Sequence, residues 1–335
     1  MTKIQIILIF FIPTILFSCR ENKRDKAEVK KSNPQMINAV KKVGVADTLI
    51  FKDAGLATLV SHTEKLFSVF DTISPFGEYY IKKFKLNKYD IDTLYKYNSD
   101  DSIPHSPKIL GFEATGILSG MICNDLEKIL GWTNIDQYDL RLLLKNHLST
   151  VRSPDGKLYS FGFEEKTGGS YKSIISYIHY KSDNNKSITI NDQDNTIFNA
   201  DGYYSIDTIN TNDGVKYLLK GNVQGCDQCF GFYIDLVSFD KGRFIKDFSY
   251  NLGSRNFEGP DEMSSDFITY DSKQHIIKIR YITDDQTPTC NCGKHGSISE
   301  DSEEEDNRTG DITCIYKFNG KTFVLKNKKA KRLRS

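Results

Sequence analysis

The second half of the chain alternates short apolar runs with turn residues, and this pattern limits the fold more than any other feature. From Ser153 onward, runs rich in Ile, Tyr and Phe are separated by Gly, Asn and Asp at fairly regular intervals. Apolar and polar residues alternate cleanly from Ile277 to Tyr281, as expected of a strand with one buried face. Tight hairpin turns are indicated at Asn212-Asp213-Gly214, Asp240-Lys241-Gly242 and Asn319-Gly320.

No run with helical spacing interrupts these segments, so helical crossovers and a parallel sheet are not expected. The sequence predicts an antiparallel β-meander, closed as a barrel, stacked as a sandwich or divided into a partial propeller-like body. No strict repeat of about 40 residues is present, which disfavours a complete propeller. The predicted strands cover residues 157–163, 171–180, 187–190, 203–209, 215–220, 230–239, 243–250, 267–271, 275–282, 312–318 and 322–325.

Residues 45–152 are predicted to be mostly helical, because apolar side chains recur there at helical spacing. One helix is expected within residues 46–70. The fold class is therefore α+β, with this small N-terminal helical region followed by a mainly antiparallel β-rich domain over residues 153–326.

A helical pair is also expected across residues 123–149. Asn124, with Glu127 three residues later, indicates a cap, and Gly131 is expected to end the first helix. Trp132 lies at the joint of the pair, where a large aromatic side chain is expected to fill the core between helices.

The N-terminus has the three parts of an export signal. Lys3 supplies a positive charge, residues 4–17 are almost wholly apolar, and a small residue precedes Cys19. The apolar run is shorter than the ~20 residues that a membrane-spanning helix needs. Residues 1–18 are therefore predicted to be a signal peptide; a plain secretory signal or a short anchor are the alternatives.

Leu16-Phe17-Ser18-Cys19 resembles the lipobox of bacterial lipoproteins. The resemblance implies that the signal peptide is removed and that the Cys19 sulfur carries a diacylglycerol, with acyl chains such as palmitate. It also implies a lipid-anchored protein of the bacterial cell envelope. Arg20 is not the Asp that resembles an inner-membrane retention signal, so the outer membrane is favoured.

The flanks of the predicted domains are polar. Residues 19–44 are rich in Lys, Asn and Glu and are expected to form a flexible tether. Residues 327–335 form a basic tail, expected to be disordered or to touch anionic lipid. The whole chain of 335 residues carries a net charge of only +1. Such a balance gives no global basic field, so nucleic acid is not an expected partner.

The alternating direction of successive strands in a meander predicts where the long loops lie. If every connection reverses the chain, the tight turns fall at one end of the sheets and the connections 224–229, 251–266 and 283–311 fall at the other. Long loops on a rigid scaffold commonly carry binding functions. Four cysteines and a histidine are thereby expected to converge at that end: Cys226, Cys229, Cys290, Cys292 and His295.

Three chemistries fit this cluster. An even number of cysteines in an oxidising envelope indicates disulfides first. Four thiolates, or three with His295, would also suit tetrahedral zinc or Cu(I), and this is the only cofactor indicated. Redox chemistry at Cys226 is disfavoured, because a redox CxxC normally opens a helix. Cys123 and Cys314 are expected to be buried thiols, or a pair if the helical region packs on the sheet.

The segment SPDGKLYSFGFEEKTGGSYKSIISYIHYK, residues 153–181, is similar to segments of bacterial envelope lipoproteins without an assigned activity. No nucleophile or paired-carboxylate motif is present, and the histidines show no metal-type spacing. The sequence therefore favours a membrane-anchored lipoprotein that binds an unknown protein or small-molecule ligand through its long loops. The alternatives are an envelope hydrolase whose site is not visible in sequence, and a Cys-rich lipoprotein that binds zinc or copper.

Overall fold

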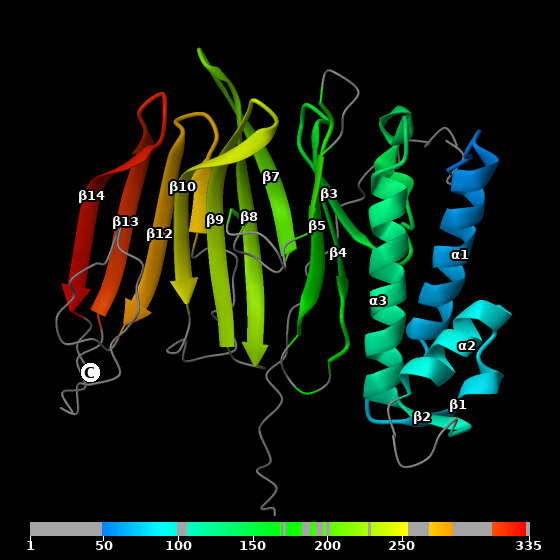
Figure 1. Cartoon of the computed structure of the whole chain (residues 1–335). Helices are drawn as coiled ribbons and strands as arrows, with labels where there is room; N and C mark the ends of the chain where they lie inside the picture. The colour runs from blue at the N-terminus through cyan, green and yellow to red at the C-terminus, as the bar shows by residue number, and fades with distance from the viewer. Residues whose placement is uncertain are drawn as a thin grey trace, which may run out of the picture. The chain divides into compact units, whose positions relative to one another are not determined.

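The fold is described from a computed structural model (Figure 1). All described residues belong to one compact unit, Ala46–Ser335. They are residues 49–98, 106–167, 169, 172–182, 188–191, 197–198, 202–226, 229–253, 268–283 and 310–332. The predicted signal peptide, the tether and Cys19 lie outside them.

Three α-helices form the N-terminal part, which confirms its helical character. Asp53 caps α1 (Ala54–Phe70) by accepting hydrogen bonds from the backbone N–H groups of Gly55 and Leu56. Asn87 caps α2 (Lys88–Tyr97) in the same way. The longest helix, α3 (Gly111–Leu130), packs against α1. A two-stranded ribbon, β1 (Glu78–Tyr80) with β2 (Lys108–Leu110), completes this region together with the 3-10 turn η1 (Ile81–Lys83). None of the described helices combines the length and apolarity needed to cross a membrane.

The predicted helical pair is wrong. The helix begins at Gly111, so Asn124 lies in its interior, although Gly131 does end it as expected. The following residues form only the short turns η2 (Ile135–Gln137) and η3 (Leu140–Leu142). A second helix does not form because Asn134 and Leu144 have positive φ angles of 65° and 47°. Trp132 is partly buried against the core, and its indole N–H donates to Asp53 at 3.3 Å.

The β-rich part is confirmed as antiparallel, and its strands are grouped into three four-stranded sheets. Each sheet is a meander of strands that follow one another in the chain, the unit from which propeller-like bodies are built. The first sheet has β3 (Ser149–Arg152), β4 (Leu158–Glu164), β5 (Ile174–Tyr180) and β6 (Ile188–Asn191). The second has β7 (Gly202–Thr211), β8 (Gly214–Cys226), β9 (Cys229–Asp240) and β10 (Arg243–Gly253). The third has β11 (Ile268–Asp271), β12 (Ile276–Thr283), β13 (Gly310–Phe318) and β14 (Phe323–Arg332).

Alternate residues of the second sheet enter two different cores. Tyr217 and Leu219 on β8 pack with the first sheet, whereas Leu218 between them packs with the third sheet. On β9, Val237 likewise joins the first-sheet core and Leu236 the third-sheet core. Successive strand residues point to opposite faces, so the second sheet is buried on both sides.

The first sheet is also covered on both faces. Phe161 and Tyr177 pack with the helices, while Leu158 and Ile178 pack with the second sheet. The outward residues Lys278 and Arg280 of the third sheet are instead exposed. This explains why the sequence alternates cleanly there and less cleanly in the other two sheets.

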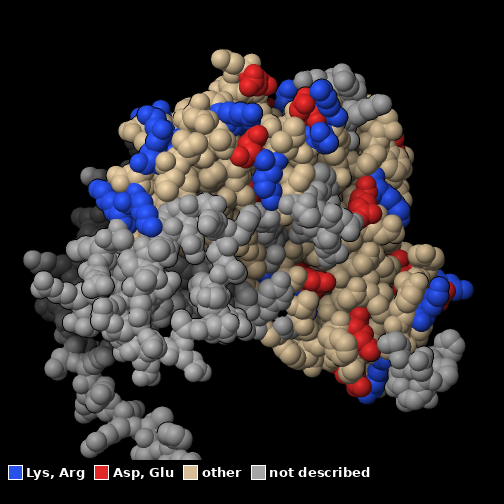
Figure 2. All heavy atoms as spheres, turned by 60° about the vertical axis from the view of Figure 1, so that its left-hand side comes forward, with Lys and Arg blue, Asp and Glu red and all other residues tan. Residues whose placement is uncertain are grey.

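Two boundaries differ from expectation. The expected loop at residues 224–229 is a tight connection, because β8 runs to Cys226 and β9 starts at Cys229, opposite it in register. The expected basic tail is in large part strand, since β14 continues to Arg332. Lys328 and Lys329 are exposed on this edge strand, where charged side chains prevent pairing with another chain. Figure 2, viewed with the β14 side of Figure 1 turned forward, shows basic and acidic side chains interspersed.

We predict that Leu236→Ala lowers the free energy of unfolding by about 2–5 kcal/mol, because it leaves a cavity between the second and third sheets. Leu236 is fully buried and lies opposite Leu218. Val215→Ala, on the exposed start of β8, is the control and is expected to cost under about 1 kcal/mol. Guanidinium unfolding curves measure both, and equal costs would contradict the stacking of these sheets.

Candidate functional site

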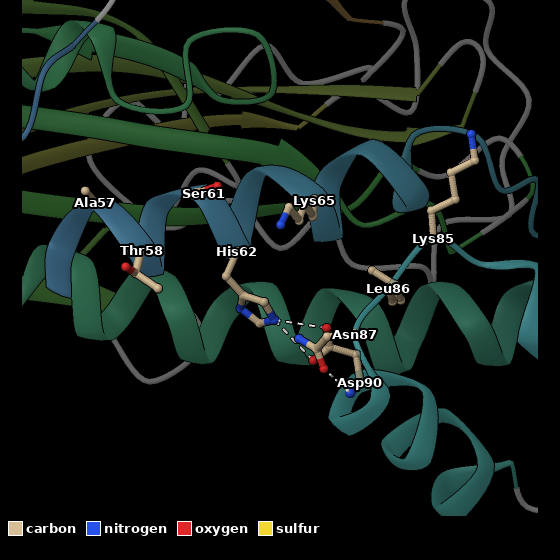
Figure 3. A pocket seen from close by; sticks show the side chains of 9 residues that line it. All are labelled: Ala57, Thr58, Ser61, His62, Lys65, Lys85, Leu86, Asn87 and Asp90. Carbon is tan, nitrogen blue, oxygen red and sulfur yellow. Dashed lines mark hydrogen bonds and ion pairs between the residues drawn. The ribbon is translucent and has the colours of Figure 1, made fainter. Parts of the chain in front are cut away.

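A histidine on α1 is held between two buried aspartates from the other two helices. His62 Nδ1 lies 2.7 Å from Asp125 Oδ2 on α3. His62 Nε2 lies 3.0 and 3.1 Å from the two carboxylate oxygens of Asp90 on α2, as Figure 3 shows. Asp90 is 1% exposed and Asp125 5% exposed. We call these three residues the carboxylate–imidazole bridge.

Local structure fixes both carboxylates. Asp90 is the third residue of α2, and its backbone N–H donates to the side chain of the capping residue Asn87 at 3.0 Å. Asp125 also accepts a hydrogen bond from the Thr63 hydroxyl at 3.3 Å, and the Lys128 ammonium lies 3.7 Å from its other oxygen.

The geometry of the bridge favours a protonated imidazole. An ionised carboxylate only accepts hydrogen bonds, so beside two ionised aspartates both ring nitrogens of His62 carry a proton and donate. Burial by itself lowers the pKa of His62, but the hydrogen bonds to Asp125 and Asp90 and the charges of both aspartates raise it above its ordinary value of 6.5.

The three side chains of the bridge are not arranged as the ligands of a single metal ion. The two carboxylates lie at opposite ends of the imidazole ring, so the three side chains do not surround one point. Among the described residues, no group of three or more His, Cys, Asp or Glu side chains is placed to hold a metal ion.

Two hollows flank the bridge, and His62 and Asp90 line both. The first, of about 700 Å³, lies between α1 and the start of α2 and includes Ser61, Lys65 and Lys85 (Figure 3). The second, of about 640 Å³, lies between α2 and α3 and is called here the α2–α3 groove.

Residues at helical spacing on α2 and α3 form the walls of the α2–α3 groove. Tyr89, Thr93 and Tyr97 follow one another at intervals of four and share one face of α2. Ile117 and Met121 stand on the facing side of α3. The groove thus has an aromatic and apolar body with the charged groups of the bridge and Lys128 at its polar end.

Two glycines of α3 leave the groove open. Gly116 and Gly120 line it, and a Cβ atom added to either would meet no heavy atom within 4 Å. Glycine inside a helix costs about 0.8–1 kcal/mol relative to alanine. The packing of the described residues does not explain why glycine is kept at these two positions. A need for an open groove does explain it.

A second buried histidine has a structural environment. His179 is fully buried and lies 2.9 Å from both Asp136 and the Thr189 hydroxyl. This order of hydroxyl, imidazole and carboxylate resembles a catalytic triad. Thr189 is, however, the direct partner of His179 in the β5–β6 register, and no solvent reaches the ring. The group ties η2 to the first sheet.

The predicted cysteine site is only partly within the described residues. Cys290, Cys292 and His295 lie outside them, and of Cys226 and Cys229 only the backbone pairing is described. The meander order on which the predicted convergence depends is present in the second and third sheets. The convergence itself stays a prediction.

The two remaining cysteines do not form a pair. Cys123 packs at the helical core, whereas Cys314 is buried in the core between the second and third sheets. Cys314 is disulfide-bonded, so the expectation of a buried free thiol is wrong at this position.

The sequence alone does not indicate the bridge. Its three residues are separated by 28 and 35 positions along the chain, and no short-range spacing relates them. The one local signal is the Asn87 cap that places Asp90 in the first turn of α2. Comparisons of the chain with protein-family models, curated proteins and solved structures find no match.

We predict that His62 titrates above pH 6.5 and that stability falls as pH rises through its pKa. Its pKa is raised on folding, so the stabilisation is fully present below about pH 6.5 and is lost above the folded-state pKa. NMR titration of the imidazole carbon-bound protons and urea unfolding from pH 6 to about 9 measure the two effects.

Asp125→Asn is expected to lower the pKa of His62, because it removes one carboxylate charge. The matched control is Asp71→Asn, at an exposed carboxylate 2.8 Å from His147, which leaves His62 unchanged. A His62 pKa at or below 6.5 in the unsubstituted protein would refute the protonated bridge.

Proposed function

We propose that this protein is a lipoprotein of the bacterial cell envelope, held at the outer membrane by an acylated Cys19, whose folded part binds a ligand. The N-terminal charge, the short apolar run and the lipobox-like Leu16-Phe17-Ser18-Cys19 support the anchor. Each buried acyl CH₂ contributes about 0.8 kcal/mol, so two or more chains hold a folded domain stably on a bilayer.

The observation that carries the binding function is the α2–α3 groove with its two helical glycines. Gly116 and Gly120 keep open a concave surface that combines exposed tyrosines with buried charged groups. Natural proteins commonly retain such locally unfavourable residues where function needs them. The ligand that fits has an aromatic or apolar body and a polar group that reaches Asp125 and Lys128.

Binding is better supported than hydrolysis at this site. A histidine that acts as a general base needs an unprotonated nitrogen within reach of a substrate or nucleophile. Both nitrogens of His62 instead face carboxylates, which favour the protonated ring. The bridge is therefore a fixed polar wall for a ligand.

We predict that the mature protein begins at a diacylglyceryl-modified Cys19 and sediments with the outer membrane. Mass spectrometry of the N-terminal peptide and membrane fractionation measure this. Cys19→Ser is expected to abolish both the modification and removal of the signal peptide. The control is Cys123→Ser on α3, which leaves both intact. Wild-type protein that keeps Met1 and lacks acyl chains would disprove the anchor.

We predict that two substitutions at Gly120 affect different properties, one the stability of the protein and the other ligand binding. Gly120→Ala is expected to raise the free energy of unfolding by about 0.5–1 kcal/mol, because alanine favours the helix and has room. Gly120→Leu is expected to fill the groove and weaken binding of indole, used as an aromatic probe, at least fivefold in NMR titration.

Glu127→Leu is the matched control, since Glu127 is exposed on the same helix and lines neither hollow. Indole shifts in the wild type should map to Tyr89, Tyr97 and Met121. Equal indole binding by the Gly120→Leu and Glu127→Leu proteins would argue against the groove as a ligand site.

A further inference from the structure

A group of large apolar side chains stands exposed at the end of α1 opposite to its capped N-terminus. Phe76 is 82% exposed, Phe112 56%, Leu110 46% and Tyr80 41%. We call these four residues the aromatic surface. Scattered single apolar residues are normal on a protein surface, whereas a contiguous group of them indicates an interaction site.

Strand pairing places two of them on one outward face. Tyr80 lies opposite Lys108, and Leu110 lies opposite Glu78, in the β1–β2 ribbon. Directly opposite residues of antiparallel strands share a face. The inward partners Tyr79 and Ile109 pack into the helical core, so Tyr80 and Leu110 point away from it together.

A close backbone approach joins the chain segments that carry the two phenylalanines. The backbone N–H of Gly111 donates to the Gly77 carbonyl oxygen at 2.7 Å. A Cβ at Gly111 would lie 2.0 Å from the Ser74 carbonyl oxygen, so only glycine permits this contact. Phe76 and Phe112 are the direct neighbours of Gly77 and Gly111.

Lysines border the aromatic surface. The ammonium groups of Lys83 and Lys108 lie 5.0 and 5.3 Å from the centroid of the Tyr80 ring. Lys108 is also paired with Glu78 at 2.6 Å, so the positive charge of the site comes from Lys83 and the other lysines beside it. Lys83 also lines a hollow of about 430 Å³ with Lys65 and Lys85, beside the hydroxyl groups of Ser68 and Thr72. Among the described residues that line this hollow, none is acidic.

From this juxtaposition we infer that the aromatic surface and the lysine-lined hollow form a contact site for an anionic phospholipid bilayer. Aromatic residues that flank lysines are typical of protein surfaces that lie in the membrane interface. Phosphate head groups suit the hollow, and the exposed rings suit the boundary between head groups and acyl chains. The inference rests on the proposed anchor, which brings the domain to a membrane.

The chain between the anchor and the domain is long enough for this contact. Twenty-nine residues separate Cys19 from Leu49, and an extended chain spans up to ~3.5 Å per residue, or about 100 Å. Helix α1 has 17 residues and is about 25 Å long. The far end of α1, which precedes Phe76, is therefore within reach of the bilayer.

Tryptophan quenching by brominated lipid tests the inference. Phe112→Trp and, as the matched control, Tyr204→Trp are made in the full chain carrying Trp132→Phe. Tyr204 is 43% exposed on β7, comparable to Leu110. The mature proteins are mixed with vesicles of phosphatidylglycerol and brominated phosphatidylethanolamine, and with brominated phosphatidylcholine vesicles as the uncharged comparison.

We expect at least twofold stronger quenching of the Phe112→Trp protein than of the Tyr204→Trp protein on the anionic vesicles. The combined change Lys65→Gln, Lys83→Gln and Lys85→Gln should remove this preference for anionic lipid. A lysine at an anionic surface contributes roughly a fivefold factor, so three contribute on the order of a hundredfold.

Flotation of the same samples separates the two proposals. Protein that floats but shows equal quenching at both positions overturns the bilayer contact, leaves the anchor standing and assigns the aromatic surface to a protein partner. Protein that fails to float with the uncharged vesicles, but floats with the anionic vesicles and is quenched by them at position 112, supports the contact and overturns the anchor. Absence of both signals overturns both.

Discussion

Burial of both faces of the second sheet is the constraint on which the rest of the structure depends. Its strands carry large apolar residues at consecutive positions, as in Tyr217-Leu218-Leu219. Such a strand needs a hydrophobic partner on each side, because unburied apolar area costs about 25 cal/mol per Å². The first sheet covers one face and the third sheet the other. The third sheet ends the series because outward positions such as Lys278 and Arg280 are polar and exposed, and the helices end it on the other side by covering the first sheet.

The helical part meets this layered body through aromatic packing. The ring of Phe67 on α1 packs edge-on against Phe163 of β4 at 5.2 Å, and Phe70 meets the same ring at 6.1 Å. The helices themselves are joined by a polar contact, since α1, α2 and α3 each contribute one residue to the carboxylate–imidazole bridge. The bridge fixes the three helices in one arrangement, because a shift of any one helix would leave a buried carboxylate without its partner.

Local patterns predict the β-rich part well and the candidate site poorly. Strand ends agree within a few residues at most positions, because turns such as Asp240-Lys241-Gly242 act over a short range. The number of sheets and their stacking cannot be predicted from the sequence. Consecutive apolar residues indicate that a strand is buried on both faces, but not which elements cover those faces. The start of α3 does not follow either, because Gly116 and Gly120 interrupt its helical pattern. Those two glycines are the only local sign of the groove in the sequence. They indicate a groove only once the structure shows the open space beside them.

The bridge and the α2–α3 groove share residues, and this links ligand binding to helix packing. Asp90 and Asp125 hold His62 and also line the groove, so a ligand that bonds to either carboxylate changes the interaction that joins three helices. Linkage then requires that the protonation of His62 and the affinity for such a ligand influence each other equally. A cationic ligand group competes with the imidazolium for the carboxylates and lowers the pKa of His62, whereas an acceptor group beside Lys128 leaves the bridge intact. A downward shift of the His62 pKa on binding thus indicates a cationic ligand group, and an unchanged pKa indicates an acceptor, even when the rest of the ligand is unidentified.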